Sequence, residues 1–534
     1  MPIPRLLATI VFCATLWPAD AIALVPPCNG GTVFEDRNGN GRRDGSGEPG
    51  LAGVQVSDGI RIVATGADGG YRLPVEPGRT TFVIKPAGYD FATRADGLPD
   101  FWRHMQPVPG PSLKYGGIPA APSPCRDFAL QAQAHRGEAL EVLVFGDPQP
   151  KSLVDVDYYR RDIVEPLVGR PRARLGLSLG DIVNDDLSLY PALNAATAKL
   201  GTPWLHVAGN HDLDSDASRD EDSLLTFRNH FGPDTFAWEE DEAVFVVLDN
   251  VVYRPGQKPA YVGGLRAEQF TFLEAYLPTL PKDRLLVLAV HIPLFNTARP
   301  GQPETFRAAD RERLFALLQA FPHVLLLSAH SHNQQHVLHD TATGWHGAGS
   351  LHEYNVGAAC GAFWSGAKDA AGIPDSTMSD GTPNGYATLQ VKRGGEYALA
   401  WHPARDPAAA TIALHAPKVL RRGAYPAWAV YANVFMGRDD TRVEYRIDDR
   451  EWKPMVKTMQ PDPRLLAENV RDDLADALRG YDRSPEATPS PHLWRGALPT
   501  DLDAGEHRIE VRAIDPWLGE QRAGTRYRLQ QAAE

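Results

Sequence analysis

The sequence predicts an α/β fold: a layered αββα core flanked by an N-terminal and a C-terminal β-sandwich-like domain. Apolar, strand-like runs alternate with helix-like spacing between residues 136 and 398. On both sides of this stretch the pattern changes to short apolar runs separated by Gly-, Pro- and Asp-rich turns. The 534 residues also exceed what one ordinary core accommodates, so several domains are expected.

The first 23 residues are set apart from the fold. Arg5 precedes an apolar run, Leu6–Trp17, and small residues follow, including Ala21 and Ala23. This order predicts a secretory signal peptide cleaved near one of those two alanines. An uncleaved membrane anchor is the alternative, but it needs a longer apolar run. We therefore expect residues 1–23 to be removed, no transmembrane segment, and a periplasmic or secreted protein.

Residues 24–135 are predicted to form the N-terminal β module. Cys28 and Cys125 bracket its strand-like runs, and export permits a disulfide between them. Two free thiols are the alternative. Cys360 is then expected to be a lone buried thiol.

One loop of this module has the ligand spacing of an EF-type calcium site. Asp36, Asn38, Asn40 and Asp44 occupy the first, third, fifth and ninth positions. The twelfth position, which should carry a bidentate Glu, is a glycine, and Glu48 follows it. A turn without an ion is the alternative. The loop resembles the calcium-binding β-sandwich repeats of bacterial surface proteins, so calcium is a possible ligand here.

Residues 136–398 are predicted to form the central α/β domain. Its largely continuous apolar runs are typical of strands covered on both faces: Val142–Phe145, Leu175–Leu179, Trp204–Ala208, Val244–Leu248, Leu286–Val290 and Val324–Ser328. Helix-like apolar spacing occurs in the stretches between them: Tyr158–Val168, Leu265–Leu277 and Arg307–Ala320.

Residues 399–534 are predicted to form the C-terminal β-rich accessory domain. Val443–Ile447 and His507–Arg512 alternate apolar with polar residues, as strands with one buried face do. Met459–Pro491 is a Pro- and Asp-rich insert with one helical piece. The two β modules could contact envelope polymers.

The charge balance argues against one class of partner. The net charge is −13, with 54 Lys and Arg against 67 Asp and Glu. Because nucleic-acid binders usually carry a basic stripe, and none is found, nucleic-acid binding is not expected.

Side chains that bind metals follow five of the strand-like runs. They are Asp147, Gln149, Asp181, Asn210, His291, His330 and His332. Ligands of α/β sheets gather at the carboxyl ends of the strands, so these side chains are expected to meet. Each alone could be a turn or capping residue, but together they match two divalent transition-metal ions (Mn, Fe or Zn) bridged by Asp181.

In order, these segments resemble motifs of the calcineurin-like metallophosphoesterase superfamily: D-x-H, G-D-x-x-x-D, G-N-H-D/E, an isolated H, and G-H-x-H. The whole chain is similar to a secreted bacterial branch with N- and C-terminal calcineurin-associated β domains. Two positions depart from the motifs, since Gln149 replaces a His and Ala329 replaces a Gly. The resemblance implies a phosphatase or phosphodiesterase, hydrolysing phosphomonoesters or phosphodiesters by a hydroxide that bridges two metal ions.

The resemblance also suggests roles for residues beside the ligands. His211 is expected to donate a proton to the departing oxygen, and Asp212 to orient His211. Asp185 is either another supporting acid or a solvated loop residue. Four residues of the later Gly-rich loops are possible substrate-binding residues, with loop packing as the alternative: His352, Tyr354, Trp364 and Asn384.

Two other functions stay open at this point. One is a pyrophosphatase acting on nucleotide or sugar diphosphate linkages. The other is a cell-surface binding protein in which the metal centre is vestigial.

Overall fold

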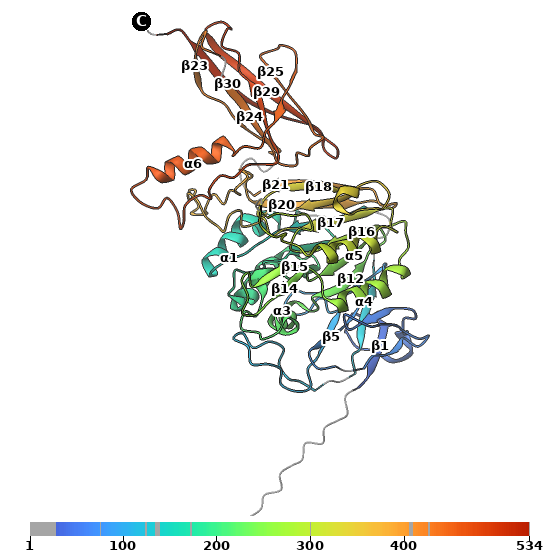
Figure 1. The fold of residues 1–534 in the computed structure, drawn as a ribbon. Helices are drawn as coiled ribbons and strands as arrows, with labels where there is room; N and C mark the ends of the chain where they lie inside the picture. The colour runs from blue at the N-terminus through green and yellow to red at the C-terminus, as the bar shows by residue number, and fades with distance from the viewer. Residues whose placement is uncertain are drawn as a thin grey trace, which may run out of the picture.

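The computed structural model describes residues 28–532 apart from 75, 123–124, 134–138, 171–172, 299–300, 405–409 and 426–427. The predicted signal peptide lies outside the described residues. Figure 1 shows an N-terminal β module, a central layered domain and a C-terminal β module in a row. Within the described part of the chain, no helix combines the length and apolar character that crossing a membrane requires.

Two mixed β-sheets form the middle of the central domain. The first has the order β11-β10-β9-β20-β21 and the second β12-β13-β16-β17-β19-β18. The first sheet comprises β9 Leu140–Phe145, β10 Leu175–Leu179, β11 Trp204–Val207, β20 Gly385–Val391 and β21 Tyr397–Pro403. The second comprises β12 Thr235–Glu239, β13 Ala243–Leu248, β16 Leu285–Ala289, β17 Val324–Ser328, β18 Gln335–His339 and β19 Leu351–Asn355.

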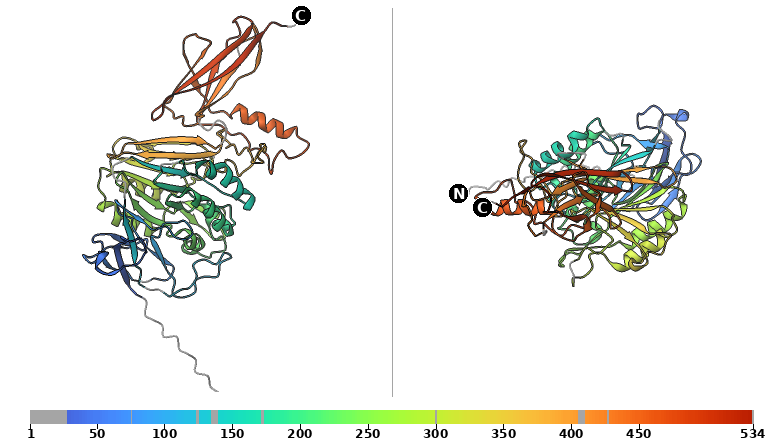
Figure 2. Two further views of the ribbon diagram at one scale, coloured as in Figure 1. Left: turned by 180° about the vertical axis from the view of Figure 1, so that it is seen from behind. Right: turned by 90° about the horizontal axis from the view of Figure 1, so that it is seen from above.

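The inner strands are the apolar runs of the sequence, and every residue of β10, β13 and β16 is buried. Helices cover the two sheets from outside (Figures 1 and 2). On the first sheet, the ring centroids of Tyr159, at the end of α1, and Phe145 lie 6.2 Å apart. On the second sheet, the ring centroids of Phe315, in α5, and His339 lie 5.1 Å apart. The predicted layered α/β fold is therefore confirmed.

The α-helices are α1 Leu153–Tyr159, α2 Tyr190–Thr197, α3 Leu225–Phe231, α4 Ala267–Tyr276, α5 Ala308–Leu318 and α6 Pro463–Asp473. The predicted ranges match α4 and α5 within a few residues. The helix expected at Tyr158–Val168 instead begins as α1 and continues as a π-helical and a 3-10 turn up to Leu167. A short hairpin, β14 Val251–Tyr253 and β15 Tyr261–Gly263, lies outside the two sheets.

The N-terminal module consists of two four-stranded sheets, β4-β1-β8-β6 and β3-β2-β5-β7. Their strands are β1 Gly30–Glu35, β2 Gln55–Ser57, β3 Ile62–Ala64, β4 Gly70–Arg72, β5 Arg79–Val83, β6 Tyr89–Phe91, β7 Trp102–Met105 and β8 Phe128–Ala132. Cys28 and Cys125 form the predicted disulfide, and Cys360 is free and buried.

A buried ion pair joins this module to the central domain. Lys85 follows β5, and its ammonium lies 2.8 Å from Glu240 Oε1 with side-chain exposures of 0% and 3%. Lys85 Nζ also donates to the carbonyl of Glu239, and the Trp238 ring lies 5.3 Å from it. The apolar core is continuous across this contact, so the two parts form one folding unit.

The C-terminal module has two sheets, β22-β24-β28-β27 and β23-β30-β29-β25-β26, and an apolar core of its own. Its strands are β22 Ile412–His415, β23 Val419–Arg421, β24 Ala429–Val434, β25 Arg442–Ile447, β26 Lys453–Pro454, β27 Val456–Lys457, β28 Leu493–Ala497, β29 Gly505–Asp515 and β30 Gly519–Gln530. The boundary expected at residue 398 falls inside β21, because that strand pairs with β20 in the central sheet.

A polar network connects the C-terminal module to the central domain. Asp380 Oδ2 accepts the N–H of Gln334, two residues after His332, at 2.8 Å. The same oxygen accepts a hydrogen bond from His492 Nε2 at 3.0 Å, and Asn433 donates to the Asp380 carbonyl. All four residues are buried, so the C-terminal module holds the segment that carries His332.

Lys85→Met should lower the free energy of unfolding by about 3–5 kcal/mol, because it leaves the Glu240 carboxylate buried without its cation. Lys392→Met is the matched control, since Lys392 and Glu396 are 65% and 70% exposed and such pairs contribute about 0–1 kcal/mol. Urea denaturation followed by tryptophan fluorescence measures both. Equal effects of the two variants would contradict the assigned role of the Lys85 pair.

Candidate metal centre

The predicted ligands converge at the carboxyl ends of strands from both central sheets. Asp147 follows β9, Asp181 follows β10 and Asn210 follows β11, all in the first sheet. His291 follows β16 and His330 follows β17 in the second. Parallel neighbours end at a common edge, which explains how segments far apart in sequence meet.

The ligand loops share an unusual backbone conformation. Asp147, Gln149, Asp181, His330 and His332 all have positive φ angles, between 39° and 70°. Side chains other than glycine rarely adopt this left-handed region, and such residues cluster at functional sites. The sharp turns aim consecutive polar side chains back toward the ends of the sheets.

Two glycines allow the loops to approach one another closely. A Cβ atom on Gly180 would lie 2.4 Å from His291 Nδ1, and one on Gly209 would lie 2.2 Å from Asp181 Oδ1. Gly180 also has a φ of 91°. The glycines preceding Asp181 and Asn210 are therefore steric requirements of the site.

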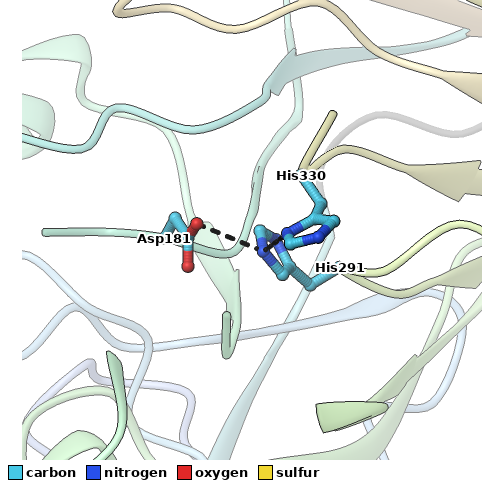
Figure 3. A group of neighbouring side chains, drawn as sticks. All are labelled: Asp181, His291 and His330. Carbon is cyan, nitrogen blue, oxygen red and sulfur yellow. Dashed lines mark hydrogen bonds and ion pairs between the residues drawn. The ribbon is translucent and has the colours of Figure 1, made fainter. Parts of the chain in front are cut away.

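One group of donors surrounds Asp181 (Figure 3). His291 Nε2 lies 3.3 Å from Asp181 Oδ2 and 3.1 Å from Asn210 Oδ1. His330 Nδ1 lies 3.1 Å from His291 Nε2. One ligand atom each of Asp181, His291 and His330 fall within 4.8 Å of one another, so these residues can hold a metal ion.

The other predicted ligands lie close to Asp181 and to Asp147. Gln149 Nε2 lies 3.4 Å from Asp181 Oδ2, and His332 Nε2 lies 3.7 Å from Asp147 Oδ1. The Asp147 carboxylate accepts the His330 N–H at 3.1 Å. Asp147, Gln149 and Asp181 are almost completely buried, so two carboxylates and a carboxamide share a space without bulk water.

Burial and mutual proximity shift the pKa values of these groups. Burial, together with the Asp181 charge, raises the pKa of Asp147 to about 8. Burial alone would lower the pKa of His291, but the Asp181 and Asp147 carboxylates raise it to about 9. Burial lowers the pKa of His330 to about 3 and that of His332 to about 4. Burial therefore disfavours the charged forms of Asp147, His330 and His332.

These donors fit divalent transition metals. Neutral imidazole nitrogens and carboxylate oxygens are the ligands that Mn, Fe and Zn accept. His291 Nδ1 donates to the carbonyl of Leu179 and His332 Nδ1 to that of Gly361, at 2.8 and 2.7 Å. Such bonds fix the ring and turn the Nε2 lone pair toward the cluster. Cations there would also compensate the buried carboxylates.

Three family models match successive parts of the chain. The model for the N terminal of calcineurin-like phosphoesterase matches residues 37–113, that for calcineurin-like phosphoesterase itself residues 140–334, and that for its C terminal residues 353–521. The chain belongs to the calcineurin-like phosphoesterase family. The family and the metal-dependent hydrolysis of phosphate esters that the sequence predicts are confirmed.

Solved structures resemble this calcineurin-like phosphoesterase only distantly. A purple acid phosphatase from yellow lupin (Lupinus luteus) seeds is 13% identical, with 66% of this chain and 67% of that chain covered and a TM-score of 0.35. PhoD is 13% identical (65% and 81% covered, TM-score 0.34). GAP50, the anchor in the inner membrane complex of Plasmodium, is 14% identical (50% and 85%, TM-score 0.31). No curated protein matches the sequence.

The predicted pairing of Asp212 with His211 is not what the structure contains. His211 Nδ1 lies 2.8 Å from Asp185 Oδ1 instead. The buried Asp212 carboxylate accepts the N–H groups of Gly209 and Ile182, at 2.8 and 3.1 Å, and the Tyr190 hydroxyl at 3.0 Å. Asp212 is turned inward because it closes the turn that carries Asn210 and His211, which leaves Asp185 to orient the imidazole.

The four possible substrate-binding residues are buried, with hydrogen-bond partners inside the protein. His352 bonds to His336 and Tyr397, and the Tyr354 hydroxyl donates to Gln334. The Trp364 indole donates to the Pro148 carbonyl, and Asn384 donates to Asp162. All four are at most 5% exposed. Gly-rich surroundings suggested an open loop, but these long side chains fill the interior beneath it.

The possible calcium ligands come together in one loop. Asp36 accepts the N–H groups of Gly39 and Gly41, and the amides of Asn38 and Asn40 donate to Asp44 Oδ2. Glu48, displaced by one residue from the ideal position, reaches the Asp44 N–H with one oxygen, while its buried Oε1 has no hydrogen-bond partner. Calcium binding by this loop stays a prediction.

Some residues at the site were not predicted from sequence. The Tyr261 ring lies 6.2 Å from the His330 ring, and the Phe363 ring lies 4.8 Å from the His332 ring. Asn250 Oδ1 accepts the N–H of His291 at 3.1 Å. Phe363 lies within a motif-like Cys-Gly-Ala-Phe-Trp run, but Tyr261 and Asn250 carry no local signal because tertiary packing alone brings them there.

Asp212→Ala should lower the free energy of unfolding by roughly 2–4 kcal/mol, because it leaves buried N–H groups and a hydroxyl without an acceptor. Asp185→Ala is the matched variant, since its carboxylate is 72% exposed. It should change stability by less than about 0.5 kcal/mol while lowering activity. Urea denaturation measures both, and equal destabilisation would contradict the division of roles between Asp185 and Asp212.

Proposed function

We propose that this chain is an exported, binuclear metal-dependent phosphoesterase that hydrolyses phosphomonoesters or phosphodiesters. The observation that carries the proposal is the convergence of seven metal-binding side chains at the strand ends, more donors than one tetrahedral ion accepts. Asp181 Oδ2 lies 3.3 Å from His291 Nε2 and 3.4 Å from Gln149 Nε2. His291 in turn contacts Asn210 and His330, and Asp147 contacts His332. A shared carboxylate suits two neighbouring ions.

The metal ions, when bound, would supply an activated water and positive charge toward the phosphoryl oxygens. The chain itself holds the ligands in place. Asp181 Oδ1 accepts the His211 N–H at 2.8 Å, which fixes this carboxylate relative to the next loop. Gln149 in place of a histidine would contribute a neutral oxygen, with its N–H donated toward Asp181.

His211 is the group we assign to the departing oxygen. It is only partly buried, and Asp185 holds its Nδ1 at 2.8 Å. Burial lowers the pKa of His211, but Asp185 and Asp181 outweigh that effect and raise it above the ordinary value. With Nδ1 held by Asp185, Nε2 is the ring atom left to donate a proton to the departing oxygen.

Export is supported by the predicted signal peptide and by the Cys28–Cys125 disulfide. Disulfides persist in oxidising compartments and are rare in the cytosol. A vestigial binding protein is disfavoured because only one ligand position, Gln149, departs from the motifs. The envelope polymer contact expected of the β modules stays a prediction.

His211→Ala should lower kcat by about 10²–10⁴-fold for alkyl phosphates, whose leaving oxygen needs a proton. The loss should be much smaller for p-nitrophenyl esters, whose leaving group departs as a stable anion. Metal content, measured by plasma mass spectrometry, should stay unchanged. An equal loss on both substrate types would contradict the proton-donor role.

Metal removal tests the centre itself. The metal-loaded protein should carry two equivalents of Mn, Fe or Zn, and chelation should abolish hydrolysis, which the same metal then restores. Asp181→Asn should lower both the metal content and the activity, whereas Asp241→Asn, in the half-buried bend between β12 and β13, should change neither. Activity in the chelated protein would refute the proposal.

A substrate panel separates the remaining alternatives. Aryl phosphomonoesters, aryl phosphodiesters and a nucleotide sugar, each followed by product release, distinguish an esterase from a pyrophosphatase. Hydrolysis of the nucleotide sugar alone would assign the pyrophosphatase activity instead. Metal binding without hydrolysis of any member would favour the binding protein.

A further inference from the structure

Phe363 is an exposed ring at the edge of the proposed metal centre. Its side chain is 41% exposed, and no other phenylalanine among the described residues is exposed to this degree. Its ring centroid lies 4.8 Å from that of His332, with 37° between the planes. Large apolar side chains are usually buried, so this position calls for an explanation.

The backbone that presents Phe363 is strained. Phe363 and Trp364 have φ angles of 63° and 54°, a conformation that bulky residues rarely adopt. The neighbouring residue holds this turn, since Trp364 is fully buried, its indole donates to the Pro148 carbonyl at 2.9 Å, and its N–H donates to the Cys360 carbonyl. The fold therefore maintains a costly conformation whose visible result is an exposed ring beside a ligand.

A cation accompanies the ring. Lys151 Nζ lies 4.8 Å from the Phe363 centroid, and Lys151 is itself exposed. Lys151 is two residues after Gln149, on the loop that carries Asp147. An electron-rich aromatic ring and an exposed positive charge thus lie together next to His332.

We propose that Phe363 and Lys151 form a subsite for a phosphate ester that carries a planar aromatic substituent, such as an aryl group or a nucleobase. The substituent stacks on the Phe363 ring, and the ammonium pairs with the anionic phosphoryl group. This inference rests on the proposed phosphoesterase function and narrows its substrate class.

Phosphonates test the subsite without hydrolysis. Calorimetric titration of the full, metal-loaded chain compares phenylphosphonate with methylphosphonate, which share the anion and differ in the ring. The wild-type protein should bind phenylphosphonate about two- to tenfold more tightly, the range expected for one aromatic pair. Absence of that preference would overturn the proposal.

Phe363→Gly should abolish the preference while leaving methylphosphonate affinity and metal content unchanged. Because glycine adopts positive φ freely, this variant should not lower the thermal unfolding midpoint. Phe363→Trp should keep the preference, and Leu338→Ala, which removes another exposed apolar side chain, should not alter it. If Phe363→Gly lowered the affinity for both phosphonates equally, or lost metal, the ring would only support His332. Either result would overturn the proposal.

Lys151→Gln should lower the affinity for both phosphonates by the same factor, because the substitution removes a positive charge but leaves the Phe363 ring in place. A loss confined to phenylphosphonate, or no loss, would overturn the part assigned to the lysine. Failure of the proposed function is distinguishable from failure of the subsite. If the protein prefers phenylphosphonate but hydrolyses no ester, the proposed function is refuted. If it hydrolyses esters but shows no preference for phenylphosphonate, the subsite is refuted.

Discussion

Two carboxylates buried side by side are the constraint on which the arrangement of this molecule depends. Asp147 and Asp181 lie at the ends of neighbouring strands, with exposures of 0% and 1%. Water cannot solvate them, so their charge must be balanced by protons, imidazoles or cations. The left-handed turns at the strand ends, the two glycines and the surrounding histidines can all be understood as means of bringing compensating groups within reach.

The sequence predicted what depends on local pattern and order. Continuous apolar runs located β10 and β17 at their observed bounds, because strands covered on both faces leave a strong signal. The proposed ligands lie where this pattern predicted them, within a few residues of the ends of such strands. The spacing of Cys28 and Cys125, bracketing one module, likewise sufficed to predict their disulfide.

Features that depend on three-dimensional packing escaped prediction. Asp212 is adjacent to His211 in sequence and Asp185 is distant, yet it is Asp185 that faces the imidazole in the folded protein. Trp364 and Phe363 are adjacent in sequence, yet one is fully buried and the other exposed. A pattern of residue types cannot distinguish such neighbours, because the choice is made by the shape of the space that each side chain meets.

The flanking modules are attached in different ways. The N-terminal module shares its apolar core with the central domain. The C-terminal module has a separate core, but its Phe435 and Met436 join the central core, and its His492 and Asn433 bond to Asp380. Exchange of the C-terminal module between proteins, by recombination or by design, is consequently limited by both the apolar and the polar part of this contact. A replacement module must bring its own donor to Asp380, or this buried carboxylate keeps only the N–H groups of Gln334 and Thr382.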